Sequence, residues 1–293
     1  MQPLRKFMHI KGVKVKNRRV FMGRKLFCEI SPLTYQISMH KCIAVRHIKN
    51  ALSKEKFAKT KGEPLPIVIY KHNSLIRRKL GNVDLQLQEN KAVNLGLAAP
   101  KITGIIIKPG ETFSLWKLVG SCTKRKGYKE GLTIAKGDAS KGIGGGMCQL
   151  SNLIHWMILH TGMEITEHHH HDQLDLFPDF KRVIPFGTGT SIMYNYLDYR
   201  FKNTTDITYQ LIIYTTDEYL CGELRADKRQ NYSYHIDAED VFFSKEADGI
   251  VYRTKVDVNT GNKVEKQLIR TNHAKVCYDT SNLEIVDLTK DTK

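Results

Sequence analysis

The sequence is organised around the stretch Gly144-Gly145-Gly146-Met147-Cys148-Gln149-Leu150-Ser151. Three consecutive glycines allow a tight turn in which the backbone adopts positive φ values and approaches another segment closely. Residues 149–160, which follow at once, are amphipathic, and Gly162 comes soon after them. We therefore predict a glycine turn followed by a helix over about residues 148–160, with Cys148 in its first turn.

The position of Cys148 indicates a chemical role. Unpaired N–H groups and the helix dipole at a helix N-terminus favour a thiolate. A thiolate with an imidazole nearby is sufficient for cysteine-based acyl transfer. The alternative is that Cys148 is a small buried residue that packs in the core. We expect His155, about 10 Å along the helix axis, on the polar face and too far from Cys148 for a hydrogen bond.

Four consecutive histidines follow the helix, at residues 168–171. Alternate residues of an extended chain share a face, so His168 pairs with His170 and His169 with His171. Either pair could serve Cys148 in proton transfer, or join it as zinc ligands. The residue pattern does not choose between the pairs.

Two further kinds of group could support such a site. Gln149 could donate a hydrogen bond to an oxyanion from its side-chain amide or its backbone N–H. The acids near enough in sequence to orient an imidazole are Asp172, Asp175 and Asp198.

The chain is strongly basic. Its 293 residues include 46 Lys and Arg against 30 Asp and Glu, a net charge of +16, and nine basic residues precede the first acid, Glu29. Such a balance favours an anionic partner: nucleic acid, an anionic envelope surface or an acidic substrate. Nucleic acid is disfavoured because the basic residues lack interleaved aromatics. We interpret the N-terminal segment as a solvated basic arm that could associate with an anionic surface.

Cysteine usage and hydropathy bear on location. The six cysteines form no C-x-x-C pair, which favours free thiols in a reducing compartment over a disulfide framework or a zinc finger. The first 26 residues lack the apolar core of a signal peptide, and no run of ~18 apolar residues occurs. We therefore expect a cytoplasmic protein without a transmembrane segment.

The pattern of the whole chain predicts an α+β fold. Helical periodicity over about residues 36–60 and 71–99 flanks a short strand at residues 67–70, and another strand is expected at 105–107. Period-two alternation dominates after the histidines, at about residues 194–201, at 207–214 and in a hairpin around residues 251–262. We expect the Cys148 helix to pack on a mostly antiparallel sheet.

These patterns also divide the chain into three segments. Residues 1–65 form the basic arm and a helical segment, and residues 66–227 form the main domain. Residues 228–293 form a β-rich C-terminal extension.

Several separated blocks of the sequence resemble the VanW family. The stretch that contains Cys148 matches the signature G-G-G-x-C-Q-[VIL]-S. Residues 97–114 resemble the family's L-A-A…G…P-G-E-x-F-S block, residues 127–131 its Y-x-E-G turn, and residues 197–203 its L-D-[LF]-[KR]-[VF]-[KR]-N strand. Because these blocks fall in the family's order over about residues 80–227, the chain is identified as a member of this family.

The resemblance also selects among the histidines. The family carries E-R-H-x-H at a fixed distance after its cysteine, which places the glutamate on Glu167 and the histidines on His169 and His171. His168 stands in the arginine position. The family's D-A-T-V segment corresponds to residues 189–192, where Gly189 replaces the acid. Either Asp198 or another group orients the imidazole, or this role is weakened in the protein.

The resemblance implies a function. The family's domain is linked, in secreted multidomain members, to cysteine-based L,D-transpeptidation of peptidoglycan stem peptides. It thus implies a cysteine acyltransferase or peptidase that needs no metal or cofactor, in which Cys148 attacks a stem-peptide amide and His169 or His171 relays protons. The supporting or orienting residues would be Gly145, Gly146, Gln149, Ser151 and Asp198.

Two alternatives stay open. The first is a non-catalytic accessory protein that binds a cell-wall precursor or a partner. The second is a metal-binding module that uses His169, His171 and Cys148.

Overall fold

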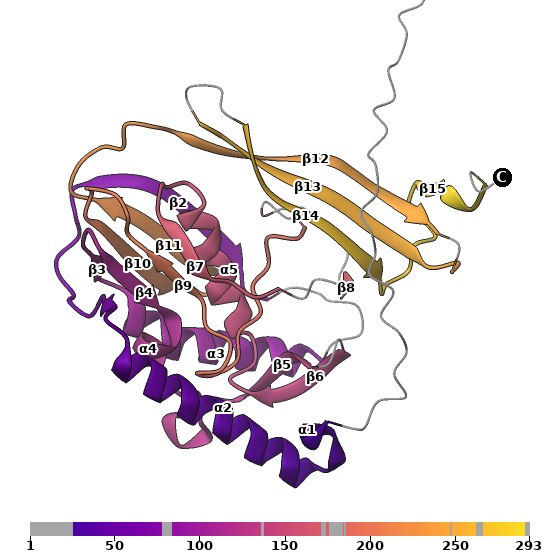
Figure 1. Ribbon diagram of the computed structural model, residues 1–293, viewed down its shortest axis with the longest axis horizontal. Helices are drawn as coiled ribbons and strands as arrows, with labels where there is room; N and C mark the ends of the chain where they lie inside the picture. Colours follow the sequence, from indigo (N-terminus) through magenta and orange to yellow (C-terminus); the bar gives the residue numbers. More distant parts are fainter. Residues whose placement is uncertain are drawn as a thin grey trace, which may run out of the picture. The chain divides into compact units, whose positions relative to one another are not determined.

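The computed structural model describes residues 26–77, 84–135, 138–170, 174–175, 184, 186–246, 248–261 and 266–290 (Figure 1). The chain divides into two compact units, Met1–Lys41 and Cys42–Lys293. Helix α1 (Phe27–Ile30) and the first half of α2 (Pro32–Leu52) belong to the first unit. Reciprocal backbone-to-hydroxyl hydrogen bonds between Ser31 and Thr34, of 2.9 and 3.2 Å, cap the start of α2.

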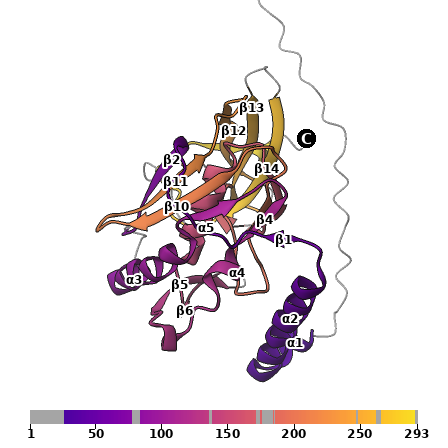
Figure 2. The ribbon, with the colours of Figure 1, turned by 90° about the vertical axis from the view of Figure 1, so that its left-hand side faces the viewer.

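The core of the second unit is an antiparallel sheet with the strand order β2-β11-β10-β3. Its strands are β2 (Ile67–Leu75), β11 (Tyr219–Ala226), β10 (Tyr209–Thr215) and β3 (Ile105–Ile107). Helices α3 (Leu85–Ile102) and α5 (Met147–Ile158) pack on this sheet (Figure 2). Close packing of α5 depends on Gly222 of β11, because a Cβ there would lie 2.8 Å from the Met157 side chain.

A second sheet has the strand order β1-β4-β9-β7. Its strands are β1 (Lys56–Phe57), β4 (Glu111–Ser114), β9 (Arg200–Lys202) and β7 (Glu164–Glu167). Phe113 and Phe201 stack on this sheet with their ring centroids 4.7 Å apart. Helix α4 (Leu115–Val119) follows β4, then the short helix η1 (Lys124–Lys126) and the hairpin of β5 (Glu130–Ala135) and β6 (Asp138–Ile143), which leads into the glycine turn.

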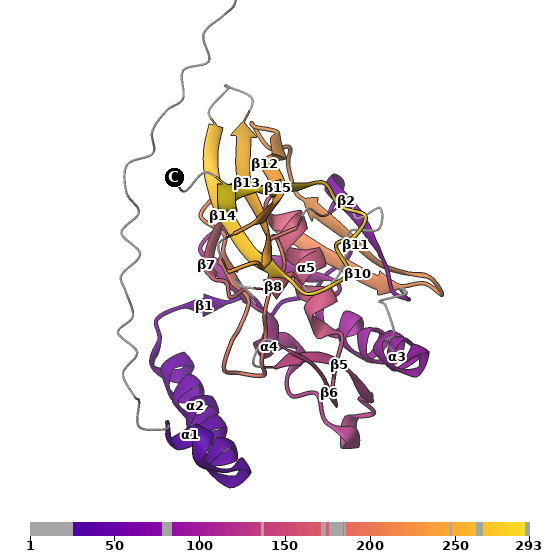
Figure 3. The same ribbon diagram turned by 90° about the vertical axis from the view of Figure 1, so that its right-hand side faces the viewer.

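The C-terminal part of the chain forms a third sheet, in the order β15-β12-β13-β14-β8. Figure 3 shows its three long strands side by side, in gold. The strands are β12 (Tyr234–Lys245), β13 (Val251–Gly261), β14 (Lys266–Val276), β15 (Ile285–Asp287) and β8 (Leu174–Asp175), and the short helix η2 (Leu288–Lys290) ends the described chain. The hairpin predicted around residues 251–262 is the pair β13–β14.

The α+β class and the packing of the Cys148 helix on an antiparallel sheet are confirmed. The helix predicted over about residues 71–99 is confirmed from Leu85, where α3 begins, but the prediction is wrong over residues 71–75, because β2 continues through Leu75 and pairs with β11. Tertiary pairing there outweighs the polar composition of residues 71–74. The three-segment division of the chain stays a prediction.

None of the helices in the described parts of the chain has the length and apolar character needed to span a membrane.

Candidate functional site

In the glycine turn, side chains at Gly145 and Gly146 would collide with neighbouring atoms. A Cβ on Gly145 would lie 2.2 Å from the carbonyl carbon of Gly131. Gly146 has a φ of +93°, and a Cβ there would lie 2.2 Å from Cγ of Lys91. The N–H groups of Gly145 and Gly146 donate to the carbonyls of Gly142 and Leu132, each at 3.1 Å. The two glycines therefore shape the turn, and their N–H groups are used within it.

Asn94 of α3 fixes the glycine turn through side-chain hydrogen bonds, a role that the sequence did not reveal. Its side chain is fully buried and its amide donates to the carbonyls of Gly145, at 2.9 Å, and Lys129, at 3.0 Å. Its oxygen accepts the N–H of Lys129 at 2.8 Å. The signal that could have identified it is a polar residue between the apolar positions of α3, because a buried polar side chain needs hydrogen-bond partners.

Cys148 lies in the first turn of α5, as predicted, and is partly exposed. Burial raises the pKa of its thiol, and the backbone N–H groups of Ile192 and of Cys148 itself act in the opposite direction without offsetting burial. Among the residues that the structure describes, no imidazole is hydrogen-bonded to this thiol. The surroundings of the sulfur therefore favour the thiol over the thiolate, although two backbone groups act in the other direction.

A short segment, residues 189–192, connects Cys148 with the histidines, and we call it the strap. Asn152 of α5 accepts hydrogen bonds from the N–H of Thr190 at 2.6 Å and from its hydroxyl at 2.9 Å. The N–H of Ser191 donates to the carbonyl of His169 at 2.7 Å. The strap thus contacts Cys148 through Ile192 and His169 through Ser191.

Ser151 and Gln149 have supporting contacts. The hydroxyl of Ser151 donates to the carbonyl of Cys148 at 3.0 Å and contacts the Thr190 hydroxyl. The side-chain amide of Gln149 donates to the Ser74 hydroxyl and the Leu75 carbonyl, each at 2.9 Å. Its backbone N–H donates to the Gly146 carbonyl at 3.0 Å. Both donors of Gln149, predicted to serve an oxyanion, therefore hold α5 to β2 and to the glycine turn.

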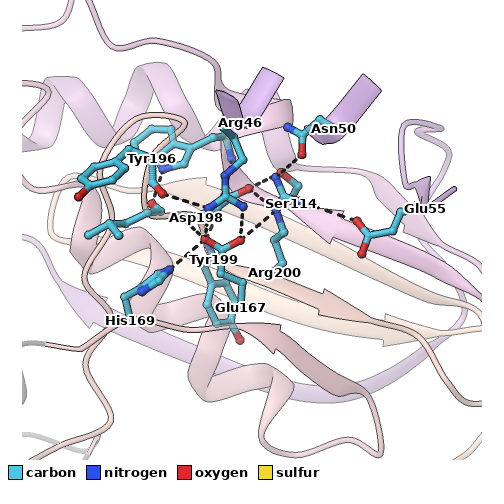
Figure 4. A network of polar contacts seen from close by, with 12 residues as sticks. Arg46, Asn50, Glu55, Ser114, Glu167, His169, Tyr196, Asp198, Tyr199 and Arg200 are labelled. Carbon is cyan, nitrogen blue, oxygen red and sulfur yellow. Dashed lines mark hydrogen bonds and ion pairs between the residues drawn. The ribbon is translucent and has the colours of Figure 1, made fainter. Parts of the chain in front are cut away.

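The imidazole of His169 is oriented by Glu167 (Figure 4). Its Nε2 lies 2.9 Å from Oε1 of Glu167. The guanidinium of Arg46, on α2, donates two hydrogen bonds to the same carboxylate, at 2.5 and 2.7 Å. The N–H of Asp198 adds a third donor at 2.9 Å. Sequence reasoning placed Glu167 in a motif without giving it a role, and missed Arg46.

The carboxylate of Asp198 is used elsewhere. It is fully buried and accepts the Ser114 hydroxyl at 2.6 Å and Nε of Arg200 at 2.7 Å. It also accepts the backbone N–H groups of Trp116, at 3.1 Å, and Tyr199, at 2.9 Å. Asp198 thus contributes to the imidazole only through its backbone, which positions Glu167, and its side chain anchors β4, α4 and β9.

The environment of Glu167 lowers the pKa of its carboxyl. Burial acts to raise the pKa, but hydrogen bonds from Arg46, His169 and the Asp198 N–H outweigh it. A carboxylate with a depressed folded-state pKa stabilises the fold above its ordinary pKa, and this contribution is lost as the pH falls through the folded-state value.

In Glu167→Gln we expect the free energy of unfolding to fall less than in the wild type as the pH is lowered below about 4.3, the ordinary pKa of glutamate. The free energy of unfolding, measured in urea between pH 3 and 7, tests this. Glu89→Gln is the control, because Glu89 also pairs with an arginine but its side chain is 51% exposed. An unchanged acid dependence in Glu167→Gln would contradict the account.

Three other histidines, His155, His168 and His170, form a cluster of ring contacts. His168 lies against His155, with ring centroids 4.1 Å apart, and against His170, at 4.2 Å. The Tyr199 hydroxyl lies 3.0 Å from Nδ1 of His155. Burial lowers the pKa of His155 well below its ordinary value, and lowers that of His168 to about 4. The prediction that His155 lies on a polar face is wrong, because α5 is buried on almost every side.

His171 lies outside the described residues, so its pairing with His169 stays a prediction. Within the described part of the chain, no three His, Cys, Asp or Glu side chains are placed to hold a metal ion. The metal-binding alternative names His171 and therefore also stays a prediction.

Comparison with known proteins gives a family match and two relatives. The family model described as VanW like protein matches residues 90–225. The Vancomycin B-type resistance protein VanW of Enterococcus faecalis is 37% identical over 228 residues, which are 76% of this chain and 82% of that protein. The Uncharacterized protein YoaR of Bacillus subtilis is 31% identical over 115 residues, 39% of this chain and 36% of YoaR. No solved structure matches the chain.

Proposed function

From the premise that this chain belongs to the VanW family, we propose that it acts in glycopeptide resistance or cell-wall metabolism. Its reaction would be cysteine-dependent acyl transfer on peptidoglycan-type stem peptides, as an L,D-transpeptidase or a peptidase. One observation carries the proposal. The Cys148 sulfur, at the start of α5, is faced by the N–H of Ile192, and the strap that supplies this donor is bonded to His169.

The reaction begins with transfer of the Cys148 thiol proton to the imidazole of His169, with His171 as the second candidate for this role. The thiolate attacks the amide carbonyl of the stem peptide. The oxyanion accepts hydrogen bonds from the N–H groups of Cys148 and Ile192. The amine leaves with the proton held by the imidazole, and a thioester remains on Cys148. An acceptor amine, or water in a peptidase, then attacks the thioester and releases the thiol.

Glu167 has a defined part in this scheme. Its carboxylate accepts a hydrogen bond from Nε2–H of the neutral imidazole, which leaves Nδ1 of His169 as the proton-accepting nitrogen. Because the pKa of Glu167 is low, the carboxylate stays ionised at neutral pH and stabilises the imidazolium that forms. Glu167 thus takes the orienting role for which the sequence suggested Asp198 or another group.

We expect Cys148 of the substrate-free protein to react slowly with iodoacetamide at pH 7. Because burial raises its pKa, the rate should rise only above the ordinary thiol value of about 8.5. Mass spectrometry of each cysteine peptide across pH measures this, with the exposed Cys277 as the internal control. Alkylation of Cys148 below pH 7, at a higher rate than Cys277, would contradict this expectation.

The function itself is tested with synthetic stem peptides. Acyl transfer predicts a thioester adduct on Cys148, detected by intact mass, and cross-linked or hydrolysed peptide products. If no stem peptide gives an adduct or a product, the result would contradict the proposed acyl-transfer activity.

The second candidate is a non-catalytic accessory protein that binds a cell-wall precursor through the same site. The raised pKa of the Cys148 thiol, which disfavours the thiolate that acyl transfer needs, favours it. This candidate predicts that Cys148→Ala preserves the cellular phenotype at a normal protein level, whereas the enzyme predicts its loss.

A further inference from the structure

The second half of α2 contributes two side chains to the network around His169, although it lies outside the residues matched by the family model. Arg46 donates twice to the carboxylate of Glu167, at 2.5 and 2.7 Å, and once to the carbonyl of Tyr196, at 3.0 Å. Four residues later, on the same side of the helix, Asn50 accepts a hydrogen bond from Arg200 at 2.9 Å. Figure 4 shows both side chains reaching from α2 toward Glu167 and Arg200.

These contacts are polar. None of the side chains of α2, all of which the structure describes, is buried, and Val45 and Ile48 are exposed. The side chain of Arg46 is 20% exposed, and that of Glu167 is 14% exposed. Packing of apolar side chains therefore contributes little at this place, and hydrogen-bond geometry determines where Arg46 lies. An arginine that meets a carboxylate with two parallel hydrogen bonds fixes the carboxylate's orientation as well as its charge.

Glu167 links Arg46 to the imidazole, because its carboxylate is hydrogen-bonded to both Arg46 and His169. The charged groups around its carboxylate come from three places: Arg46 from α2, Arg200 of β9 at 3.5 Å, and His169 two residues along the chain. Asp198 adds its N–H, and its own carboxylate is bonded to Arg200. Arg200 therefore shares its charge with Asp198, whereas both contacts of Arg46 with a carboxylate go to Glu167.

We propose that Arg46 is a positioning residue of the site, which holds the Glu167 carboxylate so that the imidazole of His169 keeps one orientation and one tautomer. The consequence for catalysis rests on the proposed function, but the effect on the imidazole does not. Without Arg46 the half-buried carboxylate loses its strongest donor, and burial, which favours the protonated acid, is less well opposed. A protonated or rotated Glu167 no longer selects the Nε2–H form of His169.

The test uses the full chain with Arg46→Ala, read by NMR of ¹⁵N-labelled histidine side chains, in which His169→Gln identifies the His169 signals. We expect Arg46→Ala to shift the titration of His169 and to mix its tautomers, whereas Arg46→Lys restores the wild-type behaviour in part. Lys49→Ala is the matched control, because it removes one positive charge from an exposed position of the same helix. It should leave His169 unchanged.

If acyl transfer is detected, Arg46→Ala should lower kcat by about 10- to 100-fold, the cost of a misplaced catalytic group, with a smaller effect on KM. A changed His169 titration without any acyl transfer in the wild type would support Arg46 as positioning residue and reject the proposed function. An unchanged His169 titration and tautomer in Arg46→Ala would overturn the proposal, whatever the activity. If Arg46→Ala does not fold, Arg46→Lys is compared with the wild type instead. It keeps the positive charge but cannot make both hydrogen bonds to the Glu167 carboxylate.

Discussion

Gly145→Ala is expected to destabilise the protein by about 4 kcal/mol, at the upper end of single substitutions. The new Cβ would lie 2.2 Å from the carbonyl carbon of Gly131 and 2.4 Å from its oxygen. These are backbone atoms of a strand that pairs with β6, so they cannot move away as a flexible side chain can. Urea unfolding followed by circular dichroism measures the loss, with an unchanged m-value as evidence that only stability has altered.

Gly96→Ala is the matched control, because it is the same substitution within helix α3. A Cβ on Gly96 would meet only the Thr215 hydroxyl, at the ordinary distance of 3.8 Å. We expect this variant to be as stable as the wild type or more stable by up to about 1 kcal/mol, since alanine is the better helix former. Equal stability of the two variants would contradict the crowding described for the glycine turn.

Cys148→Ala is expected to lower acyl transfer by about 10⁴-fold or more, because it removes the atom that carries the acyl group. The methyl group that remains fits the same space, so the fold should be kept. The rates of stem-peptide cross-linking and hydrolysis, with the free energy of unfolding, separate these two effects. Cys148→Ser should be almost as inactive, because a serine hydroxyl is far less acidic than a thiol.

Cys277→Ala serves as the control, since Cys277 is exposed and lies on the C-terminal part of the chain. Its activity should equal that of the wild type. Full activity in Cys148→Ala would reject the nucleophile and favour the accessory protein.

The sequence predicted those parts of the molecule that depend on local pattern. The glycine turn, the helix after it and the hairpin around residues 251–262 each have a period or a turn signal of their own. The boundary of β2 was missed because residues 71–74 are polar, and only their pairing with β11 makes them a strand. The exposure of His155 was predicted wrongly because a helical wheel describes a single helix and does not show that His168 packs against this side of α5.

The candidate site was predictable only where its residues are close in sequence. Cys148 and His169 were identified by motif, but for the orienting group the sequence offered only Asp198 or an unnamed alternative. The carboxyl of Asp198 is instead buried among donors from β4, α4 and β9. Arg46 lies 121 residues before its partner Glu167, and nothing in the spacing of the chain indicates that the two meet.

The pairing of β2 with β11 can form only late in the synthesis of the chain. Leu75 of β2 pairs with Tyr219, which is synthesised 144 residues later. At about 5 to 20 residues per second, the ribosome adds this partner strand roughly 7 to 30 s after β2 has been translated. Throughout that interval the nascent chain carries a strand whose backbone groups lack their partner, a template for association with other chains. Translation speed and chaperone capture during this interval therefore bear on the yield of folded protein.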